Sequence, residues 1–249
     1  MHAIPPTTIA AVVVAPFVGS FLATLAVRLP AGRPLSGRSE CPACAVTLAP
    51  RDLVPLVSWA LSRGRCRHCG ARLGRFYPLV ELAALGVALW AATEFAGWEL
   101  WAVCGLGWAL LALAIIDVRH YLLPDGLTLP LIPAGLAVAW LHGPAMLRDA
   151  AIGALAGFVV FAVVARVYRR LRGREGLGLG DAKLLGAAGA WVSWFGLPSI
   201  VLMASLTALA ASLVGAARAG RLDPAMPVPF GAYLGLATWL VVLYGPLLP

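Results

Sequence analysis

The sequence predicts an all-α protein that crosses a membrane about eight times, with a cytoplasmic four-cysteine zinc-binding loop between the first two membrane helices. Three observations support this prediction. Hydrophobic residues make up 61% of the 249 residues and charged residues only 12%, well below the roughly 25% of ordinary soluble chains. The apolar residues form runs close to the roughly 20 residues that a bilayer requires. Four cysteines lie in a single arginine-rich segment.

The basic residues indicate membrane topology rather than nucleic-acid binding. The formal net charge is +8, but the arginines cluster beside apolar runs, as they do in loops that stay in the cytoplasm. The first run, roughly Ile9 to Val27, is followed by Arg28 and has no lysine or arginine before it. A cleavable secretory signal has the opposite polarity. We therefore expect a retained first span with its N-terminus outside.

Seven further apolar runs follow the hydrophilic segment between Arg28 and Arg75. They extend over about 79–95, 100–116, 127–141, 150–167, 182–195, 197–217 and 230–247. The connections expected in the cytoplasm hold most of the remaining arginines, whereas the outer ones hold only Arg148, as the positive-inside rule requires. The expected organisation is a first helix in 1–28, a cytoplasmic loop in 29–76 and a seven-helix core in 77–249.

Two Cys-x-x-Cys pairs lie in the cytoplasmic loop, Cys41-Pro-Ala-Cys44 and Cys66-Arg-His-Cys69. Four thiolates with this spacing suit tetrahedral zinc, because each pair supplies two ligands from one tight turn. Gly70 can take the left-handed conformation that often follows such a turn. Disulfides are the alternative, but they are rare in a reducing cytoplasm. A redox Cys-x-x-Cys would not need to be duplicated, so we expect a structural metal.

Two aspartates stand at the borders of apolar runs. Asp117 closes the run 110–116, and Asp181 follows a glycine-rich stretch and opens another run. An ionisable residue at membrane depth costs at least about 2.5 kcal/mol, so it suggests a functional site. Two carboxylates that share a proton around one water can cleave a peptide bond without a metal. The topology puts both at the cytoplasmic face, and their individual roles as acid and base are not assigned.

Six further residues are candidates for supporting this site. They are Gly178, Gly180, Asp125, Lys183, Glu81 and Glu175. The two glycines allow the backbone to approach an extended peptide. Asp125 and Asp181 each also fit the simpler role of a helix cap. Lys183 is expected to partner Asp181 or a lipid phosphate, and the two glutamates are either secondary site residues or solvated residues at the membrane interface.

An ordered series of motifs spans nearly the whole chain. It comprises Gly19-Ser-Phe-Leu, Ser39-Glu-Cys-Pro-Ala-Cys, Tyr77-Pro-Leu-Val-Glu-Leu, Leu123-Pro-Asp-Gly, Gly178-Leu-Gly-Asp and Val228-Pro-Phe-Gly-Ala. A lone Gly-x-Gly-Asp also occurs in presenilin-like proteases, but the series is specific. With this series the chain strongly resembles the bacterial type IV prepilin peptidases. It departs from them at Ala23, where the family commonly has asparagine.

The resemblance implies that Asp117 and Asp181 are the catalytic pair of an intramembrane aspartyl endopeptidase. Such an enzyme removes the short basic leader from prepilins and pseudopilins of type IV pili and type II secretion, at the cytoplasmic face of the bacterial inner membrane. The resemblance also implies N-methylation of the new N-terminal residue with S-adenosylmethionine, and Zn²⁺ bound by Cys41, Cys44, Cys66 and Cys69. The expected partners are prepilins, pseudopilins and membrane lipids, and not nucleic acid.

Two other classes of protein remain as alternatives. A small-solute transporter would also bury acidic residues near broken helices, but it gives no reason for a four-cysteine module. A non-catalytic scaffold of a pilus or secretion platform would keep the fold without needing both aspartates. Loss of solute flux in aspartate variants would favour the transporter, whereas tolerance of Asp117→Asn would favour the scaffold.

Overall fold

The structure of the chain is a computed structural model that describes residues 5–173, 177–220 and 227–247. These residues form helices and connecting loops, and the only extended pairings among them are isolated bridges between Glu40 and Thr47 and between Arg65 and Arg72. The predicted all-α fold is therefore confirmed. The contacts divide the chain into two compact units, 1–112 and 113–249.

The first unit joins the four-cysteine loop to the first apolar helices. Its elements are α1 (Pro6–Arg28), η1 (Pro50–Asp52), α2 (Val57–Leu61), α3 (Phe76–Glu94) and the larger part of α4 (Gly97–His120). Helix α1 packs against α3, and a Cβ on Gly19 would lie 2.6 Å from the Cα of Glu81. Small residues of this kind let membrane helices approach closely. The indole N–H of Trp108 donates to the carbonyl of Ala84 at 3.0 Å and so ties α4 to α3.

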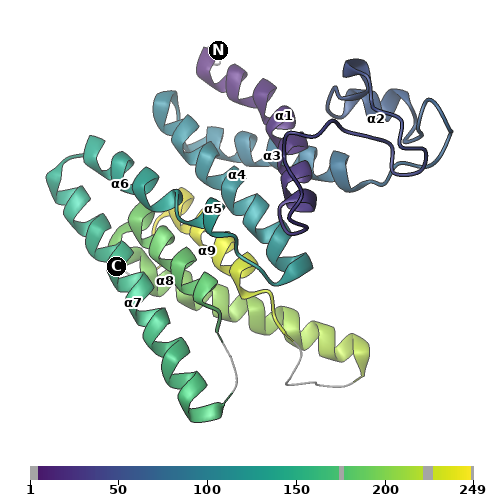
Figure 1. Cartoon of the computed structure of the whole chain (residues 1–249). Coiled ribbons are helices and arrows are strands. Elements are labelled where there is room, and N and C mark those ends of the chain that lie inside the picture. Colours follow the sequence, from purple (N-terminus) through teal and green to yellow (C-terminus); the bar gives the residue numbers. More distant parts are fainter. Residues whose placement is uncertain (1–4, 174–176, 221–226, 248–249) are drawn as a thin grey trace. The chain divides into compact units, whose positions relative to one another are not determined.

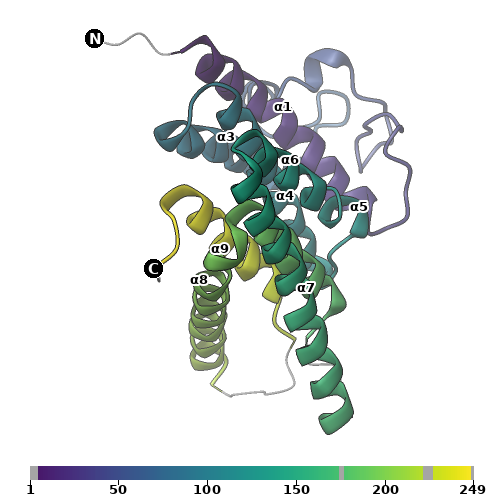
Figure 2. The same ribbon diagram turned by 90° about the vertical axis from the view of Figure 1, so that its left-hand side faces the viewer.

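The second unit is a helical bundle built around α8 (Figures 1 and 2). Besides the end of α4, its elements are α5 (Asp125–Thr128), α6 (Leu131–Leu141), α7 (Pro144–Arg172), α8 (Leu179–Ala219) and α9 (Phe230–Tyr244). Helices α6, α7 and α9 all pack against α8. Glycines on α7 and α8 face each other, so that a Cβ on Gly189 would lie only 2.2 Å from the carbonyl oxygen of Gly153. The close α7–α8 contact thus depends on the absence of side chains at these positions.

Helix α8 contains two helical segments that meet at a break. Ser193 has φ 59° and ψ −175° inside the 41-residue element, whereas the sequence predicted a connection near residues 196–198. The two predicted runs 182–195 and 197–217 thus correspond to the two parts of α8. In Figures 1 and 2 the second, C-terminal segment of α8 leads away from α7. Several of its leucines are exposed, as expected of side chains that face lipid; they are Leu202, Leu206, Leu209 and Leu213.

The helices have the length and composition of membrane spans. Among the described residues, α1, α3, α4, α7 and α8 are each long and apolar enough to cross a bilayer, and shorter apolar helices cover Asp125–Leu141 and Phe230–Tyr244. Each predicted apolar run coincides with one of these helical segments. The prediction of a multi-pass membrane protein is confirmed, and the count of eight spans holds approximately, because α8 supplies two of the runs.

Candidate active site and metal centre

Asp117 lies in the last turn of α4 and faces the beginning of α9. Its side chain is buried, with a residue exposure of 5%. Its Oδ2 accepts a hydrogen bond of 2.9 Å from the backbone N–H of Ala232, a first-turn group of α9 that also donates to the carbonyl of Pro229 at 3.2 Å. A Cβ on Gly231 would come within 3.0 Å of the same oxygen and 2.7 Å of Leu123. The glycine therefore leaves room for the carboxylate to reach the end of α9.

Asp181 lies in the first turn of α8. Its Oδ2 accepts a hydrogen bond of 3.1 Å from the backbone N–H of Gly178, the residue just before the helix. The sequence-based alternative that Asp181 caps a helix is thus realised, and capping uses one of its two carboxylate oxygens. Gly180 brings the same turn against Leu123, since a Cβ there would lie 3.0 Å from the Leu123 Cβ.

The two aspartates approach each other around Leu123. This leucine follows α4 and is in contact range of both Gly180, beside Asp181, and Gly231, beside Asp117. Leu123 therefore packs beside the backbone next to each of the two aspartates. Each also receives a backbone N–H from the amino end of a helix, α9 for Asp117 and α8 for Asp181. Helix amino ends stabilise negative charge, so the fold can hold carboxylates here despite their burial.

Lys183 pairs with Asp125, whereas the sequence offered Asp181 or a lipid phosphate as its partner. The Lys183 Nζ lies 2.6 and 2.8 Å from the two carboxylate oxygens of Asp125. Asp125 is the first residue of α5, and among the described residues this helix has no side-chain capping hydrogen bond. The Asp125 carboxylate binds Lys183 instead. The ion pair connects α5 to the first turns of α8, two residues from Asp181. Lys183 and Asp125 therefore border the aspartate pair.

Glu81 has a structural role within the first unit. It is buried, with an exposure of 5%, which contradicts the alternative that it is a solvated interface residue. Its Oε2 accepts a hydrogen bond of 2.8 Å from the backbone N–H of Leu56, a residue with a φ of 60°, which is unfavourable for a side chain of this size. The bond anchors the loop segment before α2 to α3. The other glutamate, Glu175, lies outside the described residues.

The four loop cysteines converge on one point. The sulfur atoms of Cys41, Cys44, Cys66 and Cys69 all lie within 4.8 Å of one another, and the Cys41 and Cys69 sulfurs are 3.9 Å apart. Sulfurs on a zinc tetrahedron lie about 3.8 Å apart, given Zn–S bonds of about 2.3 Å. None of the four is in a disulfide. The expectation of a four-cysteine cluster able to hold a metal is confirmed.

The turns that carry these cysteines favour thiolates. Backbone N–H groups of Ala43 and Cys44 point at the first sulfur and lower the pKa of Cys41 to about 7. In the second turn the backbone N–H of Cys69 has the largest effect and lowers the pKa of Cys66. Thiolates are the form that binds zinc. In each pair the turn thus favours the thiolate form of the first cysteine.

The fourth sulfur indicates what a cation would contribute to the cluster. The backbone N–H of Val46 lowers the pKa of Cys44, but burial and the neighbouring sulfurs outweigh it and raise this pKa to about 12. Sulfurs this close cannot all be negative without a positive charge between them. A bound Zn²⁺ would supply that charge, and four thiolates would fill its coordination sphere. The donor set therefore fits a structural zinc.

Sequence reasoning overlooked the residues that bring the aspartates together. Leu123, Gly231 and Ala232 appeared only as parts of motifs, without a role in the site. One sequence signal could have revealed them, namely Gly231 near the start of the last apolar run. A glycine in the first turn of a helix often marks a place where another part of the chain comes close to the backbone. Nothing in the sequence indicated that Leu56 is the partner of Glu81, since the two residues are 25 positions apart.

Fold and site together define a multi-pass membrane protein with a pair of aspartates at helix ends and a four-cysteine cluster able to hold a metal ion. Residues 104–213 match the family described as "Type IV leader peptidase family", and residues 13–95 match the "Bacterial Peptidase A24 N-terminal domain". The chain belongs to the type IV leader peptidase family.

Similar proteins cover most of the chain. A protein of Aeromonas hydrophila named "Prepilin leader peptidase/N-methyltransferase" is 44% identical over 210 residues, which is 84% of this chain and 72% of that protein. Two further proteins carry the same name. The one from Burkholderia pseudomallei is 43% identical over 84% of this chain and 67% of its own length. The one from Pseudomonas aeruginosa is 38% identical over 83% of this chain and 71% of its own length. No solved structure matches the chain.

Proposed function

We propose that this protein is an intramembrane aspartyl endopeptidase that removes the leader peptide from type IV prepilins or pseudopilins and N-methylates the new N-terminal residue. Its family membership and the names of its relatives support both activities. We place it in the bacterial inner membrane, with the active site facing the cytoplasm. The arginine-rich loop and the basic end of α7 support this orientation through the positive-inside rule.

One observation supports the proteolytic assignment above the others. Two aspartates from distant parts of the chain, Asp117 and Asp181, lie on either side of Leu123 at the amino ends of two helices. A transporter or a scaffold does not explain this pairing together with the family match. The glycines at the site, Gly178 and Gly180, keep the approach to Asp181 free of side chains that would obstruct an extended peptide.

In the proposed mechanism the two carboxylates share one proton and bind one water. The backbone N–H donors hold Oδ2 of each aspartate, which leaves Oδ1 of each to face the water. The ionised carboxylate takes a proton from the water as it attacks the scissile carbonyl carbon, while the protonated one donates to the carbonyl oxygen. The carboxyl group that took the proton from water then gives it to the leaving amine as the C–N bond breaks. The other carboxylate regains its proton from a hydroxyl of the tetrahedral intermediate as the new carboxyl product forms, so the pair returns to its starting state.

The cofactors are assigned to different parts of this activity. Cys41, Cys44, Cys66 and Cys69 would hold Zn²⁺ and thereby fix the fold of the cytoplasmic loop, since four protein ligands leave no position open for substrate. S-adenosylmethionine is the proposed methyl donor, and no set of described residues is assigned to it. Within the first unit Glu81 of α3 accepts a hydrogen bond from Leu56 of this loop. The conformation of the loop is therefore coupled to the position of α3.

The proposal is tested with purified full-length protein, a synthetic prepilin peptide and isotopically labelled S-adenosylmethionine, followed by mass spectrometry. We expect the leader to be released and one labelled methyl group to appear on the new N-terminus. Without the methyl donor, cleavage should persist and methylation should be lost. An intact peptide after incubation with folded, zinc-loaded protein would contradict the peptidase assignment.

A further inference from the structure

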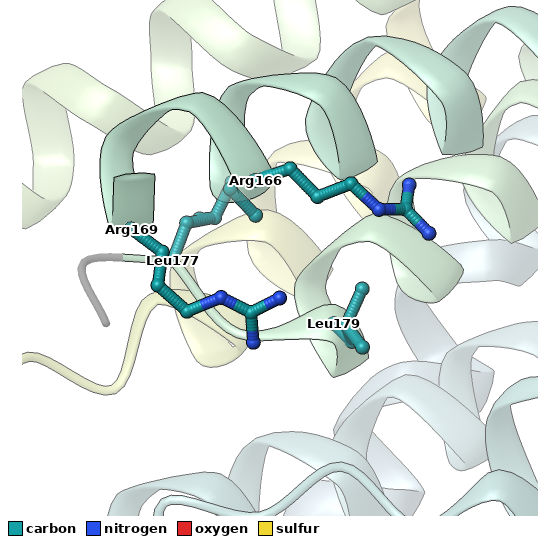
Figure 3. A pocket seen from close by; sticks show the side chains of 5 residues that line it. Arg166, Arg169, Leu177 and Leu179 are labelled. Atoms are coloured by element: carbon teal, nitrogen blue, oxygen red, sulfur yellow. The ribbon is translucent and has the colours of Figure 1, made fainter. Parts of the chain in front are cut away.

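A small basic pocket lies between the end of α7 and the beginning of α8. It has a volume of about 260 Å³ and is lined by Ala165, Arg166, Arg169, Leu177 and Leu179. Figure 3 shows the side chains of Arg166 and Arg169 reaching from α7 toward the start of α8. The five lining residues include no acidic side chain, so the pocket combines two guanidinium groups with aliphatic walls.

The two arginines of the pocket lie on one face of α7. They are three positions apart on α7 and so lie on the same face of the helix. Guanidinium groups bind phosphate oxygens through paired, charge-assisted N–H donors. Arg169 makes a further interaction within the chain, but five N–H donors per guanidinium leave capacity for a ligand as well. The chemistry of the pocket therefore selects an anion, and phosphate in particular.

The position of the pocket along α7 places it at the level of lipid headgroups. Apolar side chains are exposed along α7 up to its last turns, as expected for a face against lipid; they include Leu155, Val159, Val160, Val163 and Val164. Val167 is still 47% exposed and Leu171 is 79% exposed, whereas Arg169, Arg170 and Arg172 occupy the final turn. The pocket thus lies where the lipid-facing surface ends and the basic end of the helix begins.

We propose that this pocket binds the phosphate of an anionic phospholipid headgroup. Arg166 and Arg169 would hold the phosphate, and Leu177 and Leu179 would contact the glycerol and the first carbons of the acyl chains. Basic pockets between membrane helices are known sites for such headgroups. The volume is below the roughly 300–1,000 Å³ of pockets for drug-sized ligands, which favours a headgroup over a nucleoside cofactor. This inference depends on the membrane fold and not on the peptidase activity.

Native mass spectrometry of the full-length protein with phosphatidylglycerol or phosphatidylcholine tests the proposal. We expect one phosphatidylglycerol to remain bound under conditions that remove phosphatidylcholine, and an excess of inorganic phosphate should not displace it. The double variant Arg166→Gln/Arg169→Gln should bind it at least about tenfold more weakly, since two charge-assisted hydrogen-bonding groups are lost. Displacement by inorganic phosphate would instead identify a site for a free anion and overturn the lipid assignment.

A matched variant separates the pocket from general surface charge. Arg170→Gln/Arg172→Gln removes the same charge from the same end of α7, but neither residue lines the pocket, so lipid binding should be retained. Ala165→Leu keeps both arginines and fills part of the cavity, so it should weaken binding without a change in charge. Equal losses in the two double variants, or full binding by Ala165→Leu with an unaltered melting temperature, would refute the pocket.

Discussion

Replacement of Gly189 by alanine should separate α7 from α8. The new Cβ would lie 2.2 Å from the carbonyl oxygen of Gly153 and 2.4 Å from its carbonyl carbon. Both atoms belong to backbone, so no side-chain rotation can relieve the contact. The helices would have to move apart by about 1.2 Å to reach the 3.4 Å of an ordinary contact. Overpacking of this kind costs about 1–3 kcal/mol.

The same substitution elsewhere in α8 provides the control. A Cβ on Gly215 would meet nothing within 4 Å, and alanine is a better helix former than glycine by about 1 kcal/mol. We therefore expect Gly189→Ala to lower the thermal unfolding midpoint and Gly215→Ala to leave it unchanged or raise it slightly. The assay is thermal unfolding of the purified protein in one detergent, followed by tryptophan fluorescence.

The result also bears on the active site, because Asp181 lies two turns before Gly189 in the same helix. A shift of α8 should displace Asp181 from Leu123 and Asp117, so leader cleavage by Gly189→Ala should fall along with its stability. Equal unfolding midpoints for the two alanine variants would refute the inference that glycine is required for this helix contact.

Three further variants test individual contacts. Glu81→Ala should destabilise the protein by about 1 kcal/mol or more, because the partly buried N–H of Leu56 loses its acceptor, whereas Glu81→Gln keeps an oxygen and should unfold closer to the wild type; identical midpoints would contradict this. Cys66→Ser should remove bound zinc and make the loop sensitive to protease while leader cleavage continues, and wild-type zinc content by elemental analysis would argue against the four-cysteine site. Lys183→Met should change the unfolding midpoint only slightly, because an ion pair whose members are 30% and 57% exposed is worth no more than about 1 kcal/mol; a large loss would show that the pair with Asp125 is structurally required.

The features that follow from local sequence were predictable. Apolar runs specify membrane helices because every backbone group in lipid must be paired within its own segment. The spacing of Cys41, Cys44, Cys66 and Cys69 specifies two metal-binding turns because each pair closes on itself within four residues. Both kinds of signal depend on neighbouring residues and not on the packing of distant ones, and the structure confirms both the membrane helices and the four-cysteine cluster.

The features that depend on tertiary packing were not predictable. The glycine and proline of 196–198 indicated a break there, but the backbone departs from helical values at Ser193, which carries no strong turn signal. The sequence offered Asp181 or a lipid phosphate as partner of Lys183, yet the fold brings Asp125 from 58 positions away. For Glu81 the sequence left open a secondary site role or a solvated interface position, but the side chain is buried and accepts the N–H of Leu56. In each case a long-range contact decided what the local pattern left open.

Rates of leader cleavage by Asp117→Asn and Asp181→Asn test the proposed aspartate pair most directly. Asparagine keeps an oxygen that can accept the N–H of Ala232 or Gly178, so both variants should fold, but neither can exchange the proton. Cleavage should fall by roughly 10²–10⁴-fold, the usual contribution of acid–base catalysis. The control is Asp149→Asn, which removes a carboxylate near the start of α7, outside the site, and should cleave normally. Wild-type cleavage by either Asp117→Asn or Asp181→Asn would contradict the proposed mechanism.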